Sequence, residues 1–93
     1  MNLTQEQLDR VRELSELTIT PRLIAIAIEV DEIDFLDEIN KEGTAARQAF
    51  FTGMVTQMCN TRAAIIKAAQ NGSNPAQSEL LGFLKEQIYR INK

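Results

Sequence analysis

The sequence predicts an all-α fold of five helices, in which a helix-turn-helix-like region of three helices is followed by a long antiparallel helical hairpin. Three observations support this prediction. Apolar residues recur every three or four positions, which is the spacing of one face of an α-helix. Residues that favour helix N-termini precede the apolar runs. Both prolines and two of the four glycines fall in or beside the breaks between the runs.

The first helix is expected over residues 5–17. Thr4 and Gln7 have the spacing of a capping box, in which the threonine hydroxyl accepts a bond from a free backbone N–H and the glutamine side chain reaches back. The apolar residues that follow at three-residue steps form one buried face, and these are Leu8, Val11, Leu14 and Leu17.

The second helix begins at Thr20-Pro21, because a proline in the first turn gives up an N–H that would have no partner. Asp31 is the expected cap of a third helix over residues 32–40. The chain must therefore turn sharply at residues 29–31. The buried face expected for the third helix comprises Phe35, Leu36 and Ile39.

The fourth helix is expected over residues 45–70, between breaks at Gly43-Thr44 and Asn71-Gly72. Its apolar stripe is wider than one neighbouring helix needs to cover. A fifth helix begins at Asn74-Pro75, and the short link makes the last two helices an antiparallel hairpin. The inner face expected for the fifth helix comprises Ala76, Leu80, Leu84, Ile88 and Ile91.

Two glycines, Gly53 and Gly82, lie inside predicted helices, where each costs about 1 kcal/mol relative to alanine. This cost indicates a close approach of two helices at both points, including an approach of the two glycines to each other across the hairpin. The alternative is that both glycines are tolerated on exposed faces.

At 93 residues, the chain is expected to form one domain over residues 1–93. Within it, residues 4–42 form the helix-turn-helix-like region and residues 43–93 form the hairpin, which we expect to make a homo-oligomer. No apolar run approaches the roughly 18 residues of a membrane span, and the first residues do not have the pattern of a secretory signal. A soluble, cytoplasmic protein is expected. The residues predicted for the oligomer interface are Phe51, Val55 and Met58.

The composition argues against an enzyme. The chain has no histidine and a single cysteine, so the commonest general base and the commonest zinc ligands are missing. Cys59 lies inside an apolar helix, with no histidine and no nearby cationic pair to form a thiolate, and is expected to be buried and inert. Phosphate-binding and nucleophile motifs such as Gly-x-x-x-x-Gly-Lys and Gly-x-Ser-x-Gly are absent. We expect no catalytic residue, no metal, no cofactor and no small-molecule substrate.

Charge is divided along the chain. Residues 1–42 contain eleven acidic and four basic side chains, whereas residues 43–93 contain two acidic and six basic ones. Such a division favours either specific partners and self-association or attraction between the two halves of one monomer.

The predicted third helix occupies the position of a recognition helix but contains no lysine or arginine, and Glu29 stands where the turn usually has glycine. A helix of this charge repels phosphates, so any DNA contact must come from cations at its flanks. The candidates for this contact are Arg10, Arg12, Arg22, Lys41 and Arg47. The acidic residues favour the dipole of the third helix or form a face for a basic protein partner. They are Glu32, Asp34, Asp37 and Glu38.

The order of these elements resembles the small subunit of bacteriophage terminases. The resemblance covers about residues 20–91 and rests on Leu23-Ile24-Ala25 with Ile28-Glu29-Val30, then a long helix, then the segment from Ala68 to Ala76 before a last apolar helix. Family members often have an Ala…Gly…Asn-Pro-Ala-Ala segment there, which Asn74-Pro75-Ala76-Gln77 matches in part.

This resemblance implies a non-catalytic DNA-recognition protein that assembles into a ring through the hairpin and delivers phage DNA to a large ATPase subunit. The alternative is a protein–protein adaptor, in which a degenerate helix-turn-helix presents its acidic face to a basic partner.

Overall fold

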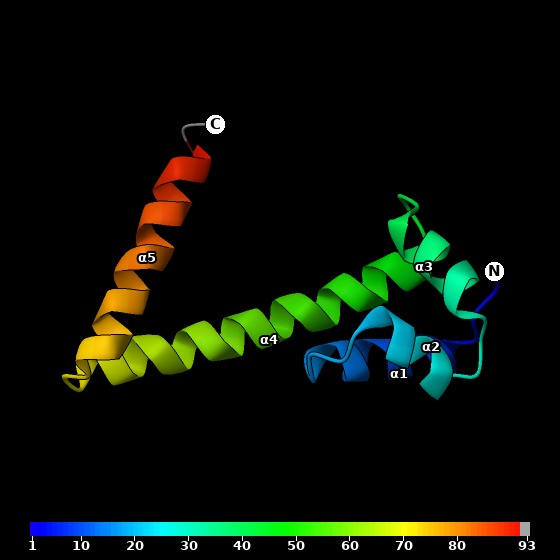
Figure 1. Ribbon diagram of the computed structural model, residues 1–93, viewed down its shortest axis with the longest axis horizontal. Coiled ribbons are helices and arrows are strands. Elements are labelled where there is room, and N and C mark those ends of the chain that lie inside the picture. Colours follow the sequence, from blue (N-terminus) through cyan, green and yellow to red (C-terminus); the bar gives the residue numbers. More distant parts are fainter. Residues whose placement is uncertain (92–93) are drawn as a thin grey trace. The chain divides into compact units, whose positions relative to one another are not determined.

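The computed structural model describes residues 1–91 and confirms the all-α fold. The described residues form five helices, which are α1 (Gln5–Glu16), α2 (Pro21–Ala27), α3 (Glu32–Asn40), α4 (Ala45–Gln70) and α5 (Asn74–Ile91) (Figure 1). The chain divides into two compact units, an N-terminal unit of residues 1–57 and a C-terminal unit of residues 58–93. The boundary lies inside α4, whereas the sequence placed it after residue 42. That residues 1–93 form a single domain stays a prediction.

The helices of the N-terminal unit begin at side chains that satisfy free backbone N–H groups. The predicted capping box is confirmed, because Thr4 Oγ1 accepts from the N–H of Gln7 at 3.1 Å and Gln7 Oε1 accepts from the N–H of Thr4 at 2.9 Å. Asp31 accepts from the N–H of Asp34 at 2.9 Å, as expected for the cap of α3. These local contacts set the positions at which the short helices begin.

Helices α1 and α2 end in the same way. The C-cap residues are Leu17 for α1 and Ile28 for α2. The residue after each, Thr18 (φ 66°) or Glu29 (φ 61°), adopts the left-handed conformation. The next residue then donates back into the last turn, Ile19 to the carbonyl of Leu14 and Val30 to that of Ala25. This is the hydrogen-bond pattern of a Schellman motif. Glu29 therefore has the conformation for which glycine is the usual residue.

One hydrophobic core joins all four helices of the N-terminal unit. Two residues expected in it, Leu17 and Leu36, are instead 66% and 40% exposed. Leu17 is the C-cap residue that follows the last residue of α1, so the chain turns away from the core there. Leu36 follows Phe35, which is fully buried, and a rotation of about 100° per residue carries it toward solvent. The core residues are Val11, Leu14, Ile24, Ala25, Ile28, Phe35, Ile39 and Ala46.

The close helix approach predicted at Gly53 is confirmed. A Cβ atom placed on Gly53 would meet the carbonyl oxygen of Arg12, and it would lie 2.8 Å from Ser15 Cβ. Ser15 is buried and donates its hydroxyl to the carbonyl of Phe50, so α1 and α4 are also joined by a hydrogen bond at this crossing. The same prediction for Gly82 is wrong, because a Cβ atom there would have no neighbour within 4 Å.

The C-terminal unit has a much smaller core. Among its described hydrophobic residues only Ala69 and Ala76 are buried, and both lie beside the turn between α4 and α5. Helix α5 begins at Asn74 as predicted, but the cap is Ser73, whose Oγ accepts from the N–H of Ala76 at 3.3 Å. Gln77 adds a bond across the turn, from Nε2 to the carbonyl of Ala69 at 3.1 Å.

Beyond this turn the two helices of the C-terminal unit diverge (Figure 1). Three residues of the inner face expected for α5 are therefore exposed. Leu84 is 45%, Ile88 59% and Ile91 77% exposed. The spacing places these residues on one face of α5, but the described residues of the same unit leave the C-terminal half of that face uncovered.

Cys59 is exposed, so its predicted burial is wrong. Within the C-terminal unit, α4 has half-buried side chains at Arg62 and Ile65 and a buried one at Ala69. Cys59 lies about a quarter-turn away from this narrow strip. A wide apolar composition does not ensure burial when, among the described residues of the unit, one diverging helix is the neighbour (Figure 1).

Candidate functional site

The five cations predicted to contact DNA all lie in the N-terminal unit, and each has a partner in the same chain. Four of them form ion pairs. These are Arg22–Glu32 at 2.9 Å, Arg10–Glu13 at 3.5 Å, Lys41–Glu38 at 3.6 Å and Arg12–Glu16 at 3.9 Å. Most of the side chains in these pairs are well exposed, so each pair is weak and a phosphate can compete for the cation.

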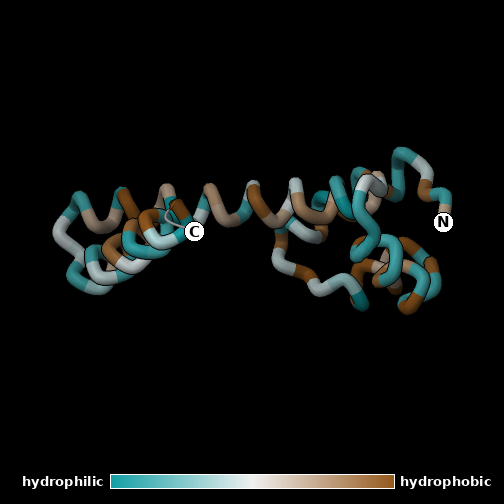
Figure 2. The backbone as a smooth tube through the Cα atoms, turned by 90° about the horizontal axis from the view of Figure 1, so that it is seen from above, coloured by the Kyte–Doolittle hydropathy of each residue, from teal (hydrophilic) through white to brown (hydrophobic). Residues whose placement is uncertain are grey.

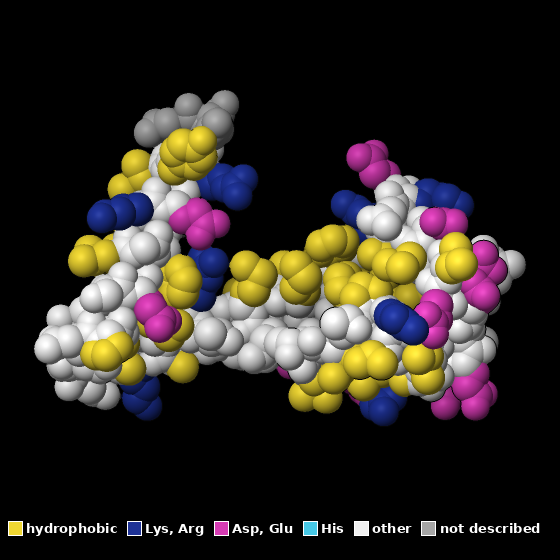
Figure 3. All heavy atoms as spheres, viewed as in Figure 1, with side chains coloured by type: hydrophobic (Ala, Val, Ile, Leu, Met, Phe, Trp, Pro, Cys, Tyr) yellow, Lys and Arg dark blue, Asp and Glu magenta, His cyan; other side chains and the backbone are white. Residues whose placement is uncertain are grey.

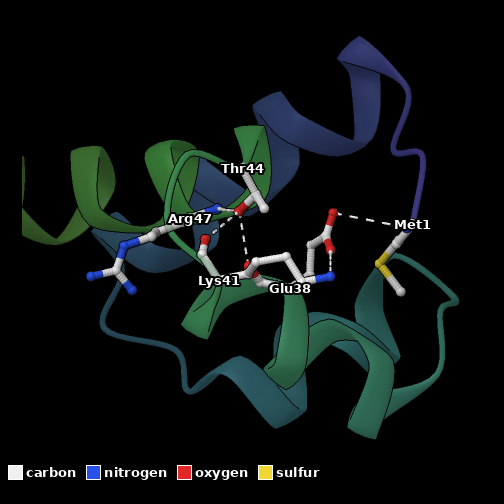
Figure 4. Close-up of polar contacts among 5 residues, drawn as sticks. All are labelled: Met1, Glu38, Lys41, Thr44 and Arg47. Carbon is white, nitrogen blue, oxygen red and sulfur yellow. Dashed lines mark hydrogen bonds and ion pairs between the residues drawn. The ribbon is translucent and has the colours of Figure 1, made fainter.

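Arg47 has a structural role. It is half-buried, and its guanidinium donates to the carbonyl of Ile39, where α3 ends, at 2.8 Å. The guanidinium also lies 4.8 Å from the centre of the Phe51 ring. Figure 4 shows the Arg47 side chain extending away from Glu38, Lys41 and Met1, which gather on the other side of Thr44. Arg47 therefore joins α4 to α3 in addition to any role toward a ligand.

The structure does not bring the five cations together as one basic patch. Arg10 and Arg12 are two residues apart on α1, so their side chains leave the helix on different sides. Lys41 and Arg47 extend in opposite directions (Figure 4). On the face drawn in Figure 3, acidic and basic side chains of this unit alternate.

The four predicted acidic residues of α3 divide into two pairs. Glu32 and Glu38 are half-buried. Glu32 forms an ion pair with Arg22, and Glu38 forms one with Lys41. Glu38 also lies 3.9 Å from the N-terminal ammonium of Met1. Asp34 and Asp37 are exposed, and neither forms an ion pair within the described residues. Beside them, Ile33 is 70% exposed. The outer surface of α3 therefore combines carboxylates with apolar side chains.

The residues predicted for an oligomer interface are exposed on α4. Phe51, Val55 and Met58 are 36%, 53% and 43% exposed. They are spaced by four and then three residues, so they follow one face of the helix. Met54 belongs to the same stretch. Hydrophobic side chains follow one another along α4 in Figure 3, and Figure 2 shows apolar residues recurring over its whole length.

The C-terminal unit contains an open groove of about 570 Å³ between α4 and α5. Its walls are mainly apolar, but Arg62 and Arg90 line it together with one carboxylate, that of Glu86. The guanidinium of Arg62 lies 4.3 Å from the centre of the Phe83 ring. The other apolar lining residues include Met58, Ile66, Leu80 and Leu84.

This groove was not predicted. Helix α5 has apolar residues on several faces, at Leu81, Phe83 and Tyr89 as well as on the expected inner face. The wide distribution of apolar residues around α5 is the sequence feature that indicates an uncovered apolar surface, because a helix with one neighbour needs only one apolar stripe. The divergence of the two helices, which creates the groove, has no local signature in the sequence.

Two further observations concern the described residues as a whole. Residues 1–91 contain no group of three or more acidic or cysteine side chains placed to hold a metal ion. No helix described in the structure has both the length and the apolar composition to cross a membrane.

No family model, curated protein or solved structure matches this chain.

Proposed function

We propose that this protein is a non-catalytic DNA-packaging or DNA-binding accessory protein, similar to the small subunit of phage terminases, and that it acts as a cytoplasmic homo-oligomer. The observation that carries the proposal is the large apolar surface that one copy leaves exposed on α4 and α5. Among the described residues beyond the N-terminal unit only two, both alanines, are buried, whereas five apolar side chains of α5 are 45% exposed or more. An exposed apolar surface of this kind is typical of a subunit interface.

The arrangement of α2 and α3 supports a helix-turn-helix in the N-terminal unit. Ile24 and Ala25 of α2, Ile28 directly after it and Phe35 of α3 share the core. Ala25 is fully buried, and its small side chain allows a close crossing of the two helices. In this proposal the two helices contact DNA through the cations at their flanks, and the partner that receives the DNA is a large ATPase subunit.

Self-association is tested by light scattering after size-exclusion chromatography. The full chain should elute as an oligomer, and Val55→Glu should shift it toward monomer, because a charge would be buried in the interface. Asn60→Glu adds the same charge to an exposed position on a different side of α4 and should leave the oligomer intact. A strictly monomeric chain would refute the ring.

DNA binding is tested by a mobility-shift assay at about 50 and about 200 mM salt, because phosphate contacts weaken steeply over that range. Arg22→Ala and Arg47→Ala should each weaken DNA binding. Each should also reduce the slope of log affinity against log salt concentration by about one, because one phosphate contact is lost. Lys85→Ala removes a cation outside the candidate set and should have less effect. Unchanged affinity of both arginine variants would reject their assignment.

A second function, that of a protein–protein adaptor, is favoured by one specific observation. All five candidate cations have partners within the chain, while the outer surface of α3 presents Asp34 and Asp37 beside exposed apolar residues. Such a surface suits a basic protein better than a phosphate backbone. Absence of DNA binding at the lower salt concentration would favour the adaptor.

A further inference from the structure

We propose that the groove of the C-terminal unit binds helix α3 of a second copy of this chain. The inference rests on the self-association proposed above and specifies a contact within it. It joins two different surfaces of the protein, the groove of one copy and the outer face of α3 of the next. The described residues of the unit that carries each surface leave that surface uncovered.

The groove has the chemistry of a site for an acidic amphipathic helix. Its walls are apolar, and it contains two guanidinium groups, those of Arg62 and Arg90, against the one carboxylate of Glu86. Arg62 lies against the Phe83 ring, which holds the cation at the apolar wall. A helix that enters this groove must therefore bring apolar side chains with carboxylates beside them.

Helix α3 has this combination on its outer face. Ile33 and Leu36 are 70% and 40% exposed, and they lie three residues apart, so both belong to one face. Asp37 follows on the same face, and Asp34 lies beside it. Both carboxylates are exposed and form no ion pair in the described part of the chain.

The charges of the two units are complementary beyond these side chains. Residues 1–57 contain eleven acidic and five basic side chains, whereas residues 58–93 contain two acidic and five basic ones. Contact between unlike units of successive copies brings opposite charges together, whereas contact between like units does not. Because the two surfaces differ, the contact is head-to-tail, and such contacts form rings when the rotation between subunits closes.

The test is a charge exchange measured by sedimentation velocity on the full chain. Asp37→Lys and Arg90→Glu should each weaken self-association by about tenfold or more, because each places like charges in contact. An equimolar mixture of the two variants should recover association, since the lysine that Asp37→Lys places on α3 of one variant then meets the glutamate that Arg90→Glu places in the groove of the other. Both substituted residues are exposed, and circular dichroism checks that each variant keeps its helical content.

Two variants control for net charge. Glu42→Lys makes the same change as Asp37→Lys but lies in the link after α3, and Lys85→Glu makes the same kind of change on α5 outside the groove lining. Both should associate like the unchanged chain. Raising the salt concentration from about 50 to about 500 mM should weaken the self-association of the unchanged chain, as expected for a contact that depends on charge.

The outcomes separate this contact from the proposed function. If Asp37→Lys and Arg90→Glu associate normally while Val55→Glu still dissociates the oligomer, docking of α3 is refuted and the oligomer stands. If the double variant Asp37→Lys/Arg90→Glu recovers association but the mixture of single variants does not, the contact lies within one chain and the second copy is refuted. A chain that is monomeric at every concentration refutes both proposals.

Discussion

Two glycines show how differently one residue type behaves in similar local sequences. Gly53 and Gly82 both lie in the interior of helices, and both cost helix stability. At Gly53 the cost is offset, because α1 approaches so closely that a side chain has no space. At Gly82 the space beside the Cα atom is open. Helix propensity is the same at both positions, so only the neighbouring helix distinguishes them.

This difference predicts opposite effects of one substitution. Gly53→Ala should lower the free energy of unfolding by about 1–3 kcal/mol, because the new methyl group collides with the backbone of α1. Gly82→Ala should raise helix stability by up to about 1 kcal/mol, since it gains propensity and meets nothing. Urea unfolding followed by circular dichroism measures both. Stabilisation by Gly53→Ala would contradict the close crossing of α1 and α4.

At the scale of elements, two threonines precede helices but differ in what their side chains do. Thr44 Oγ1 accepts from the N–H of Arg47 at 3.1 Å and also donates to the carbonyl of Glu38 at 2.8 Å. Thr44 thus caps α4 and ties it to α3. Thr20 precedes Pro21 and makes no capping hydrogen bond. The start of α2 depends instead on the fixed φ angle of the proline.

Thr44→Ala should therefore destabilise the N-terminal unit by about 1 kcal/mol, which is the usual cost of losing a cap. Thr20→Ala is the matched control and should change stability by about 0.5 kcal/mol or less, because no bond is lost. Thermal unfolding of the two variants under the same conditions compares them. Equal losses would show that the hydrogen bonds of Thr44 contribute little.

At the scale of the whole molecule, the two units differ in what holds them together. The N-terminal unit buries large side chains such as Phe35 and Ile24 completely, whereas the buried residues in the described part of the C-terminal unit are two alanines. A helix packed on so little apolar surface gains little stability from its own chain. The order of α5 should therefore depend on contact with other copies.

We predict that dilution loosens α5 selectively. As the protein concentration falls below the dissociation constant of the proposed oligomer, amide hydrogens in α5 should exchange faster, because the apolar residues of this helix would lose the cover that other copies supply in that proposal. Amides of α1 to α3 should keep their protection. Hydrogen exchange followed by mass spectrometry over a dilution series measures this. Concentration-independent protection of α5 would contradict the prediction.

The limits of sequence prediction follow the range of the interactions involved. The capping box at Thr4 and the cap at Asp31 act over three residues, so their spacing in the sequence is sufficient to locate the helix starts. The exposure of Cys59 and Leu84 depends instead on which helix lies opposite, and periodicity carries no information about that. The candidate cations were named from their charge, but the ion pair of Arg22 with Glu32 and the bond from Arg47 to the carbonyl of Ile39 join different helices and come from the packing.

The sequence alone determined that this protein is all-α, where its five helices begin, and that an acidic half precedes a basic one. These properties follow from local backbone chemistry and composition, which act within a few residues. Tertiary structure alone decided that Gly53 is a crossing point and Gly82 is not, and that the last two helices diverge to leave a groove lined by Arg62 and Arg90. The physical reason is that burial and contact depend on helices distant in the sequence, whose approach no single segment encodes.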